Sequence, residues 1–245
     1  MESRNFKLDT EWNMIHYPEK PNGFGILIIG DERHFVDEKG SFWTQNEGKQ
    51  MLINQLKNAG YTIFYSNLYG KNWGSRKAVK LAESLYEYIR RTEIINERIH
   101  LVAEGMGALV ALQLLDGNQT KIRSMVLLNP VLSLKHHLEQ EKDHKFFYKR
   151  LISEISTSFE VESTLIVDQI EQANDISISH INIPMKIIHV LSGNRAYKQS
   201  KLLNRLSVQW KDEKAPISVT FILPEKKQQL GNQIIHFISR NEKVL

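Results

Sequence analysis

The chain has 245 residues, of which 41% are hydrophobic and 24% charged, and its formal net charge is +4. These values are typical of one ordinary globular domain. It contains no cysteine, which excludes disulfides, thiol catalysis and cysteine-based metal sites. Positive and negative side chains are interspersed, so we expect no nucleic-acid partner. No apolar run approaches the roughly 18 residues needed to span a bilayer, and the polar start MESRNFKLDTEW lacks a secretion signal. A cytoplasmic location is the default expectation.

Apolar strands alternate with amphipathic helices along the first half of the chain. The run GFGILIIG has the continuous apolar character of a strand that is buried on both faces. A possible edge strand, WNMIHYP, precedes it. The hydrophobic spacing predicts strands at 12–18, 23–30, 61–68, 99–104 and 124–130, and helices at 48–59, 76–95 and 105–115.

The alternation pauses between residues 131 and 181. Within it, HHLEQEKDHKFFYKRLISEISTSF indicates one or two polar helices with no strand between them. Alternation then resumes with strands at 184–193 and 217–223 and helices at 196–210 and 227–240. Such alternation predicts an α/β fold with a mostly parallel, doubly wound sheet. We therefore expect one domain over 1–245, with 131–181 inserted as a helical cap.

The segment around Gly105 is the most informative part of the sequence. The predicted strand IHLVAE passes directly into a helix through Ala103-Glu104-Gly105-Met106-Gly107. A turn this sharp requires small residues two positions before and after its apex, where Ala103 and Gly107 stand. The apex is forced toward positive φ, which costs a non-glycine residue roughly 1–2 kcal/mol. Glycine at the apex avoids that cost.

The motif LVAEGMGALVAL resembles the nucleophile elbow of the α/β-hydrolase superfamily, the fold of serine esterases, lipases and aminopeptidases. The resemblance covers most of the chain and places Gly105 at the nucleophile position. It implies an acid near Gly193, where the sequence has no carboxylate. It also implies a base near Lys226, where the sequence has no histidine. The resemblance is therefore to a degenerate member that lacks the catalytic triad.

The resemblance also implies a site at the carboxyl ends of the strands. Oxyanion donors would come from Met106 and the residues after Gly30, but the next side chains, Asp31 and Glu32, are acidic and would oppose an oxyanion. We expect the ligand site to be lined by Asp31, Glu32, Glu104, Gly105 and Met106.

The leading hypothesis is a pseudoenzyme, without a cofactor, that binds a small apolar or acyl ligand under the cap, or a protein partner. Two alternatives are an esterase- or thioesterase-like hydrolase or acyl transferase that uses unconventional residues, and a structural subunit.

Other patterns are weaker. Gly105-x-Gly107 could begin a dinucleotide loop, but bulky Val110 stands where a third glycine is needed. His137, Glu141 and His144 have zinc-like helical spacing, although a solvated helix face is the simpler interpretation, and we predict no metal site. Ser192 could be a displaced nucleophile, but no base is evident.

Histidines and aromatic residues outside these motifs have simpler roles in the predicted fold. His100 and His189 lie in predicted strands and are expected to be structural. Four aromatic residues of the cap are predicted to seal the ligand-binding edge of the sheet: Phe146, Phe147, Tyr148 and Phe159.

Overall fold

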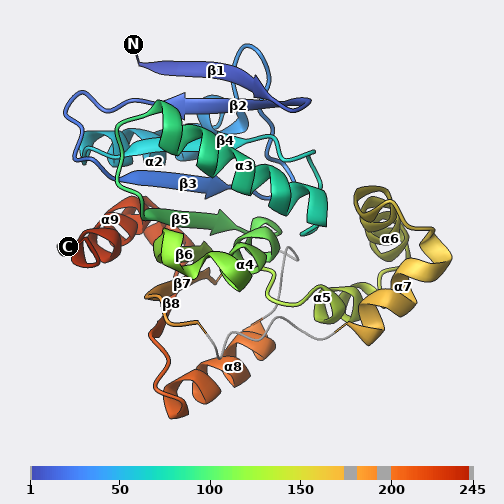
Figure 1. Ribbon diagram of the computed structural model, residues 1–245. Helices are drawn as coiled ribbons and strands as arrows, with labels where there is room; N and C mark the ends of the chain where they lie inside the picture. Colours follow the sequence, from blue (N-terminus) through green and yellow to red (C-terminus); the bar gives the residue numbers. More distant parts are fainter. Residues whose placement is uncertain (1, 174–180, 192–199, 243–245) are drawn as a thin grey trace.

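An eight-stranded sheet forms the centre of the molecule (Figure 1). The computed structural model describes residues 2–173, 181–191 and 200–242. The strand order is β1-β2-β4-β3-β5-β6-β7-β8. Strands β3 to β8 are parallel, and this confirms the predicted mostly parallel α/β sheet. The strands are β1 Ser3–Leu8, β2 Glu11–His16, β3 Gly25–Ile29, β4 Thr62–Ser66, β5 Ile99–Glu104, β6 Ile122–Leu128, β7 Met185–Val190 and β8 Ile217–Ile222.

The first edge of the sheet differs from the prediction. The segment predicted as an edge strand became β2, which pairs antiparallel with β4 on one side and with β1 on the other. The edge itself is β1, which the sequence pattern did not reveal. Its residues are polar apart from Phe6 and Leu8, and all are at least partly exposed. A short polar strand is a common way to protect a sheet edge from pairing with other chains.

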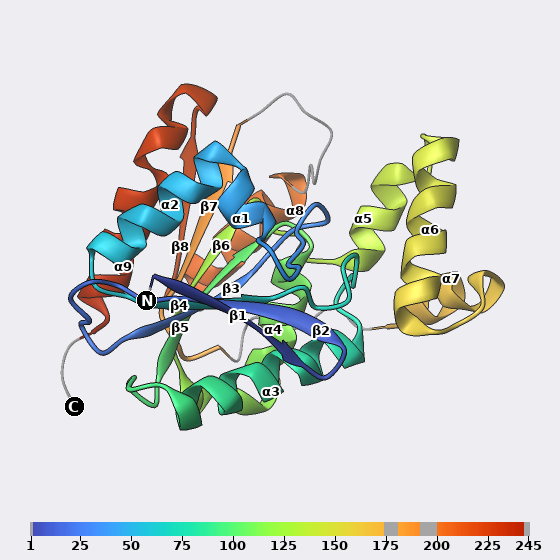
Figure 2. The same cartoon turned by 90° about the horizontal axis from the view of Figure 1, so that it is seen from above.

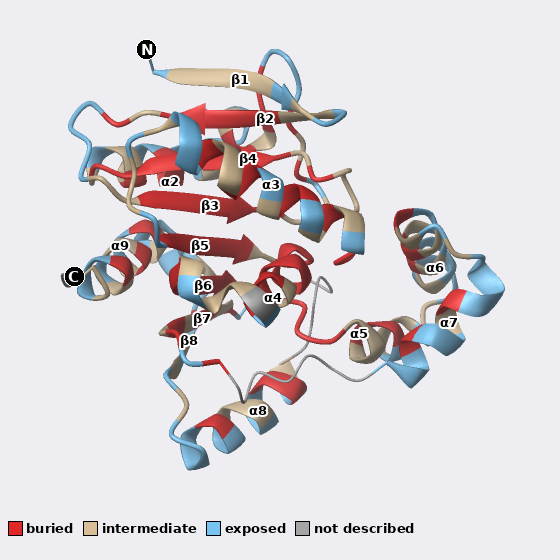
Figure 3. Ribbon diagram, viewed as in Figure 1, coloured by how far each residue is buried: buried red, intermediate tan, exposed pale blue. Residues whose placement is uncertain are grey.

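Helices cover both faces of the sheet (Figure 2). One core contains the sheet and the helices α3, α4 and α8, and the other contains the opposite sheet face with α2 and α9. Figure 3 shows that β3, β5 and the inner helix faces are buried. The covering helices are α1 Phe42–Gln45, α2 Glu47–Asn58, α3 Arg76–Thr92, α4 Gly107–Asn118, α8 Ser200–Asp212 and α9 Leu230–Arg240, with short 3-10 turns η1 Gln119–Lys121 and η3 Pro224–Gln229.

Three helices follow β6 and lie beyond the carboxyl ends of the strands (Figures 1 and 2). We refer to α5 Leu134–Glu141, α6 Lys145–Phe159 and α7 Ser163–Gln172 as the cap helices. The sequence predicted one or two polar helices over 136–159, where α5 and α6 lie, and α7 follows beyond that stretch. Each helix is polar outside but buries an apolar inner side, represented by Leu138, Leu151, Ile155, Ile166 and Ile170.

Candidate functional site

Gly105 forms the turn between β5 and α4, as predicted. Its φ angle is +52° and the residue is buried. Its backbone is fixed on both sides, because its N–H donates to Leu128 O over 3.0 Å and its carbonyl accepts from Val131 N–H over 2.9 Å. A left-handed residue at this strand-to-helix turn matches the geometry expected from the sequence.

The space above this glycine is filled by Asp31. The N–H of Met106 donates to Oδ1 of Asp31 over 3.0 Å. A Cβ atom added to Gly105 would lie 2.2 Å from the same oxygen and 2.3 Å from Cγ of Asp31. Non-bonded heavy atoms do not approach so closely. No side chain can therefore occupy position 105 while Asp31 remains in place.

Two close approaches hold Asp31 against α4. A Cβ on Gly107 would lie 2.5 Å from the carbonyl oxygens of both Ile29 and Gly30, so the end of β3 packs directly on the start of α4. Asp31 then lies at the N-terminus of that helix, where unpaired N–H groups and the helix dipole stabilise negative charge. Its carboxylate acts as a cap supplied from a distant loop, since Met106 makes no side-chain cap itself.

His34 fixes the loop that carries Asp31. Its imidazole Nδ1 accepts from the indole N–H of Trp43 over 2.9 Å, which requires its Nε2–H to donate to Ser66 O over 2.7 Å. Burial lowers the pKa of His34 to about 4, so the ring is neutral at pH 7. The N–H of His34 also donates to Asp31 O over 2.8 Å, which ties the loop to this buried cluster.

The other two predicted carboxylates point to different partners. Glu104 forms an ion pair with Lys49 of α2 at 2.5 Å, and Lys49 also lies over the ring of Trp43. Glu32 pairs with Arg150 of α6 at 3.2 Å and so connects the loop after β3 to the cap. The structure therefore brings Asp31, Gly105 and Met106 together but directs Glu32 and Glu104 elsewhere.

Of the predicted acid and base positions, only Lys226 lies among the described residues. Gly193 and Ser192 lie outside the described residues. Lys226 is exposed in η3, just after β8. The zinc pattern does not hold, because α5 ends at Glu141 and His144 caps the next helix. Within the described residues, no three metal-binding side chains cluster.

His137 is instead buried against Trp73, with ring centroids 5.5 Å apart. It therefore faces the core side of α5 and not a solvent-exposed helix face.

A serine–histidine pair does exist, but it lies at the opposite edge of the sheet. His100 Nδ1 and Ser124 Oγ are 2.8 Å apart, near the amino ends of β5 and β6, and both residues are fully buried. Burial, and then the nearby Arg123 and Arg98, lower the pKa of His100 to about 3. This pair is structural, as expected for His100. His189 of β7 is half-buried, and its ring lies 5.8 Å from that of Phe221.

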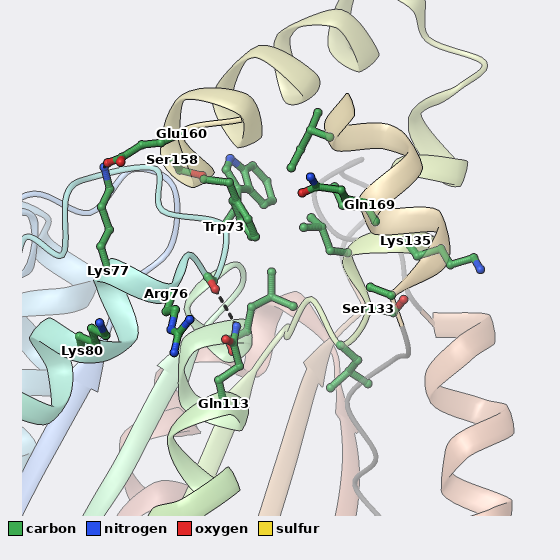
Figure 4. Close-up of a pocket in the computed structure, with 18 residues that line it drawn as sticks. Trp73, Arg76, Lys77, Lys80, Gln113, Ser133, Lys135, Ser158, Glu160 and Gln169 are labelled. Carbon is green, nitrogen blue, oxygen red and sulfur yellow. Dashed lines mark hydrogen bonds and ion pairs between the residues drawn. The ribbon is translucent and has the colours of Figure 1, made fainter. Parts of the chain in front are cut away.

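A cavity of about 800 Å³ lies between α3, α4 and the cap helices (Figure 4). Ligand pockets commonly have volumes of roughly 300–1,000 Å³. Figure 4 shows cationic side chains of α3 on one side, and Lys135 of α5 and Gln169 of α7 on the other. None of the five predicted ligand-binding residues lines this cavity. Its lining includes Trp73, Arg76, Lys80, Gln113, Lys135 and Gln169.

The loop that carries Trp73 into the cavity has an unusual backbone. Leu68, Tyr69 and Trp73 have positive φ angles of 47°, 60° and 44°. Each costs a non-glycine residue about 1–2 kcal/mol, and such strain concentrates at functional sites. Gly74 follows at +78° and packs against Leu109 of α4. Sequence reasoning missed this loop, although its place after a parallel strand could have indicated it.

The aromatic residues of the cap divide between two environments. Phe159 lines the cavity and Tyr148 packs against the apolar cluster beneath the cap. Phe146 and Phe147 are 75% and 41% exposed, so the prediction that they seal the sheet edge was wrong. Both residues lie in the first turn of α6, about one turn before Leu151, which belongs to the buried cluster.

A second cavity, of about 580 Å³, opens between α2, α9 and the ends of β5 to β7. Glu104 is the only one of the five predicted ligand-binding residues that lines it. Lys49 and Lys227 also face it, so this space is bounded by both charge signs.

Comparisons with known proteins address the fold. A family model described as the alpha/beta hydrolase fold matches residues 39–150. Est1E from Butyrivibrio proteoclasticus superposes with a TM-score of 0.67 at 11% identity, over 98% of this chain and 99% of that chain. A puromycin-hydrolyzing peptidase of Mycobacterium tuberculosis gives 0.71 at 11% identity, over 98% of this chain and 39% of its own. The chain has the α/β-hydrolase fold.

Further comparisons agree with the fold and add no activity. The acylaminoacyl peptidase of Pyrococcus horikoshii has a TM-score of 0.67 and 14% identity, over 100% of this chain and 43% of its own. No relative was found among curated protein sequences. None of the described helices combines the length and apolar character needed to cross a membrane.

Proposed function

We propose that this α/β-hydrolase-fold protein acts by binding a ligand under its cap and not by serine-type hydrolysis. The observation that carries the proposal is the position of the Asp31 carboxylate, hydrogen bonded to Met106 N–H and in contact with Gly105. We assign 1–245 to one domain, with 131–181 as the cap. We also propose a cytoplasmic location, which is compatible with a cysteine-free chain.

The first part of the proposal concerns the nucleophile. In enzymes of this fold, a sharp turn between a strand and the helix that follows it holds the nucleophile at positive φ. We assign that position to Gly105, whose single hydrogen offers no attacking atom. Asp31 cannot take over this role, because covalent catalysis also needs a base and a group that orients the base, and Gly105 supplies neither. We assign the base position to Lys226 and the acid position to Gly193, neither of which supplies that chemistry.

The second part concerns the oxyanion. In this fold the N–H of the residue after the nucleophile stabilises the negative oxygen of the tetrahedral intermediate. Met106 supplies that N–H here, and it already donates to a carboxylate. An incoming acyl oxygen would have to displace a negatively charged group and then develop its own charge beside it. This arrangement opposes the transition state of ester hydrolysis.

The cavity under the cap supports the binding part of the proposal. Most of its exposed lining is apolar, and it lies at the carboxyl side of the parallel strands, where ligands of α/β proteins bind. We propose a small acyl or otherwise largely apolar ligand. A protein partner on the cap and a purely structural role are the other noncatalytic possibilities that the same carboxylate arrangement supports.

Hydrolysis by other residues is the second candidate function, favoured by the enzymes whose structures are similar to this chain. Three of these proteins are named as peptidases, and one of the structures has ferulic acid bound to Est1E. Purified protein and an Asp31→Ala variant should be assayed with p-nitrophenyl esters and aminoacyl-p-nitroanilides. We expect no turnover by either protein. Turnover that one substitution near Gly105 abolishes would refute the noncatalytic proposal.

A further inference from the structure

The chemistry of the cap cavity narrows the class of ligand. We propose that the cavity binds a single-chain amphiphile with an anionic head group, a carboxylate or a phosphate monoester, held at Arg76 and Lys80 with its chain along Trp73 and α7. This inference rests on the proposed function, because it concerns the same cavity, but it adds the charge and the orientation of the ligand.

The head-group end is defined by cations on α3. Four cationic side chains line the cavity, against one carboxylate, Glu160. That carboxylate is already paired with Lys77 at 2.9 Å, and Lys135 donates to the carbonyl of Glu171 over 2.8 Å. Arg76 and Lys80 are exposed, and none of the ion pairs among the described residues involves them. Their charge therefore remains available to a ligand.

The start of α3 strengthens the positive potential at that end. Arg76 is the first residue of a 17-residue helix whose N-cap, Ser75, makes no side-chain capping bond. The hydroxyl of Ser75 is buried without a hydrogen-bond partner among the described residues. Cations at a helix N-terminus oppose the helix dipole. An anion bound beside Arg76 would interact favourably with the cations and with the helix dipole.

The opposite part of the cavity suits an aliphatic chain. Trp73, Leu109, Ile166 and Ile170 lie on its wall and belong to the apolar cluster between the cap and α4. Gln113, whose side-chain amide donates to Gly74 O over 2.7 Å, lies at the boundary between the two ends (Figure 4). Burying a chain on this wall gains affinity for neutral and anionic amphiphiles alike. Only the cations distinguish the two.

The test is a calorimetric titration of the full chain with decanoate, decyl phosphate and decanol. We expect both anions to bind at least about tenfold more tightly than decanol, with the difference reduced at high salt. The variant Arg76→Gln/Lys80→Gln should lose about tenfold in affinity for either anion and little for decanol. The matched control is Lys20→Gln/Lys39→Gln, which removes two exposed charges that line neither cavity.

The location is tested with Gln169→Trp, which places a large ring in the cavity from an exposed position of α7. It should abolish binding of all three amphiphiles without changing the thermal midpoint.

The outcomes separate failure of the head-group inference from failure of the proposed function. Equal affinity for decanol and decanoate, or an unchanged affinity in the α3 double variant, would overturn the anionic head group and leave ligand binding under the cap standing. Unchanged binding by Gln169→Trp would place the ligand elsewhere. Absence of binding by all three amphiphiles would overturn both the head-group inference and the acyl-ligand part of the proposed function.

Discussion

The carboxylate of Asp31 and the α-carbon of Gly105 exclude any side chain between them, since a Cβ on Gly105 would lie 2.2 Å from Asp31 Oδ1. The two residues are far apart in sequence, yet each explains the other. Glycine leaves room for the carboxylate, and the carboxylate caps the helix that begins beside that glycine. This mutual dependence can be measured directly.

Gly105→Ser should destabilise the protein by more than the roughly 1–2 kcal/mol that positive φ alone costs. The excess comes from the clash with Asp31. Gly70→Ser is the matched control, because Gly70 also has a positive φ, +67°, and no atom lies within 4 Å of its added Cβ. Urea unfolding gives both values. Equal losses for the two variants would contradict the clash, and Asp31→Gly should restore most of the excess in the Gly105→Ser background.

Asp31→Ala should cost about 1 kcal/mol of unfolding free energy, because α4 loses the acceptor for Met106 N–H. Asp31→Asn should cost less, since an amide oxygen still accepts this bond while the interaction of the charge with the helix dipole is lost. The comparison requires unfolding free energies, together with amide exchange at Met106. A slower exchange of that amide in Asp31→Ala would contradict the assigned hydrogen bond.

Acid should unfold the protein partly through His34, whose pKa is about 4 in the folded state, against an ordinary value of 6.5. A lowered histidine pKa means that the unfolded chain binds the proton first. Stability is therefore fully present above about pH 6.5, and falls as the pH decreases from 6.5 toward 4. Each unit of difference is worth about 1.4 kcal/mol. Urea midpoints at several pH values should fall less steeply in His34→Asn than in the wild type.

Exposed His236 of α9 provides the control for that measurement, and His236→Asn should reproduce the wild-type slope. An unchanged slope in His34→Asn would show that other groups, such as His16 with its pKa lowered by burial to about 4, dominate acid unfolding.

Glu154→Gln should loosen the cap. This carboxylate of α6 pairs with Lys71 and Arg150 and accepts from the indole of Trp73 over 3.1 Å. Because both cations are partly exposed, the expected loss is only about 1 kcal/mol. Hydrogen exchange over 145–159 should nevertheless accelerate. Glu139→Gln, at an exposed carboxylate of α5, should leave that exchange unchanged, and equal effects would refute the tether.

The sequence by itself determined the α/β alternation and the turn at Gly105. Both are local: hydrophobic periodicity records which faces of a strand or helix are buried, and glycine records a positive φ angle. The sequence did not predict the polar edge strand β1, because its residues show no strong apolar alternation. The sequence also did not predict the separate ion-pair partners of Glu32 and Glu104, because neighbouring positions in a sequence do not determine where long side chains point.

Only the tertiary structure decided what lies above Gly105 and where a ligand can bind. The contact of Asp31 with Met106 joins two loops that follow different strands, and it depends on the close approach of Gly107 to the end of β3. The cap cavity likewise combines side chains from a strained loop, two sheet-covering helices and the cap. Such sites arise from the packing of distant elements, and the residue pattern of any one element does not specify them.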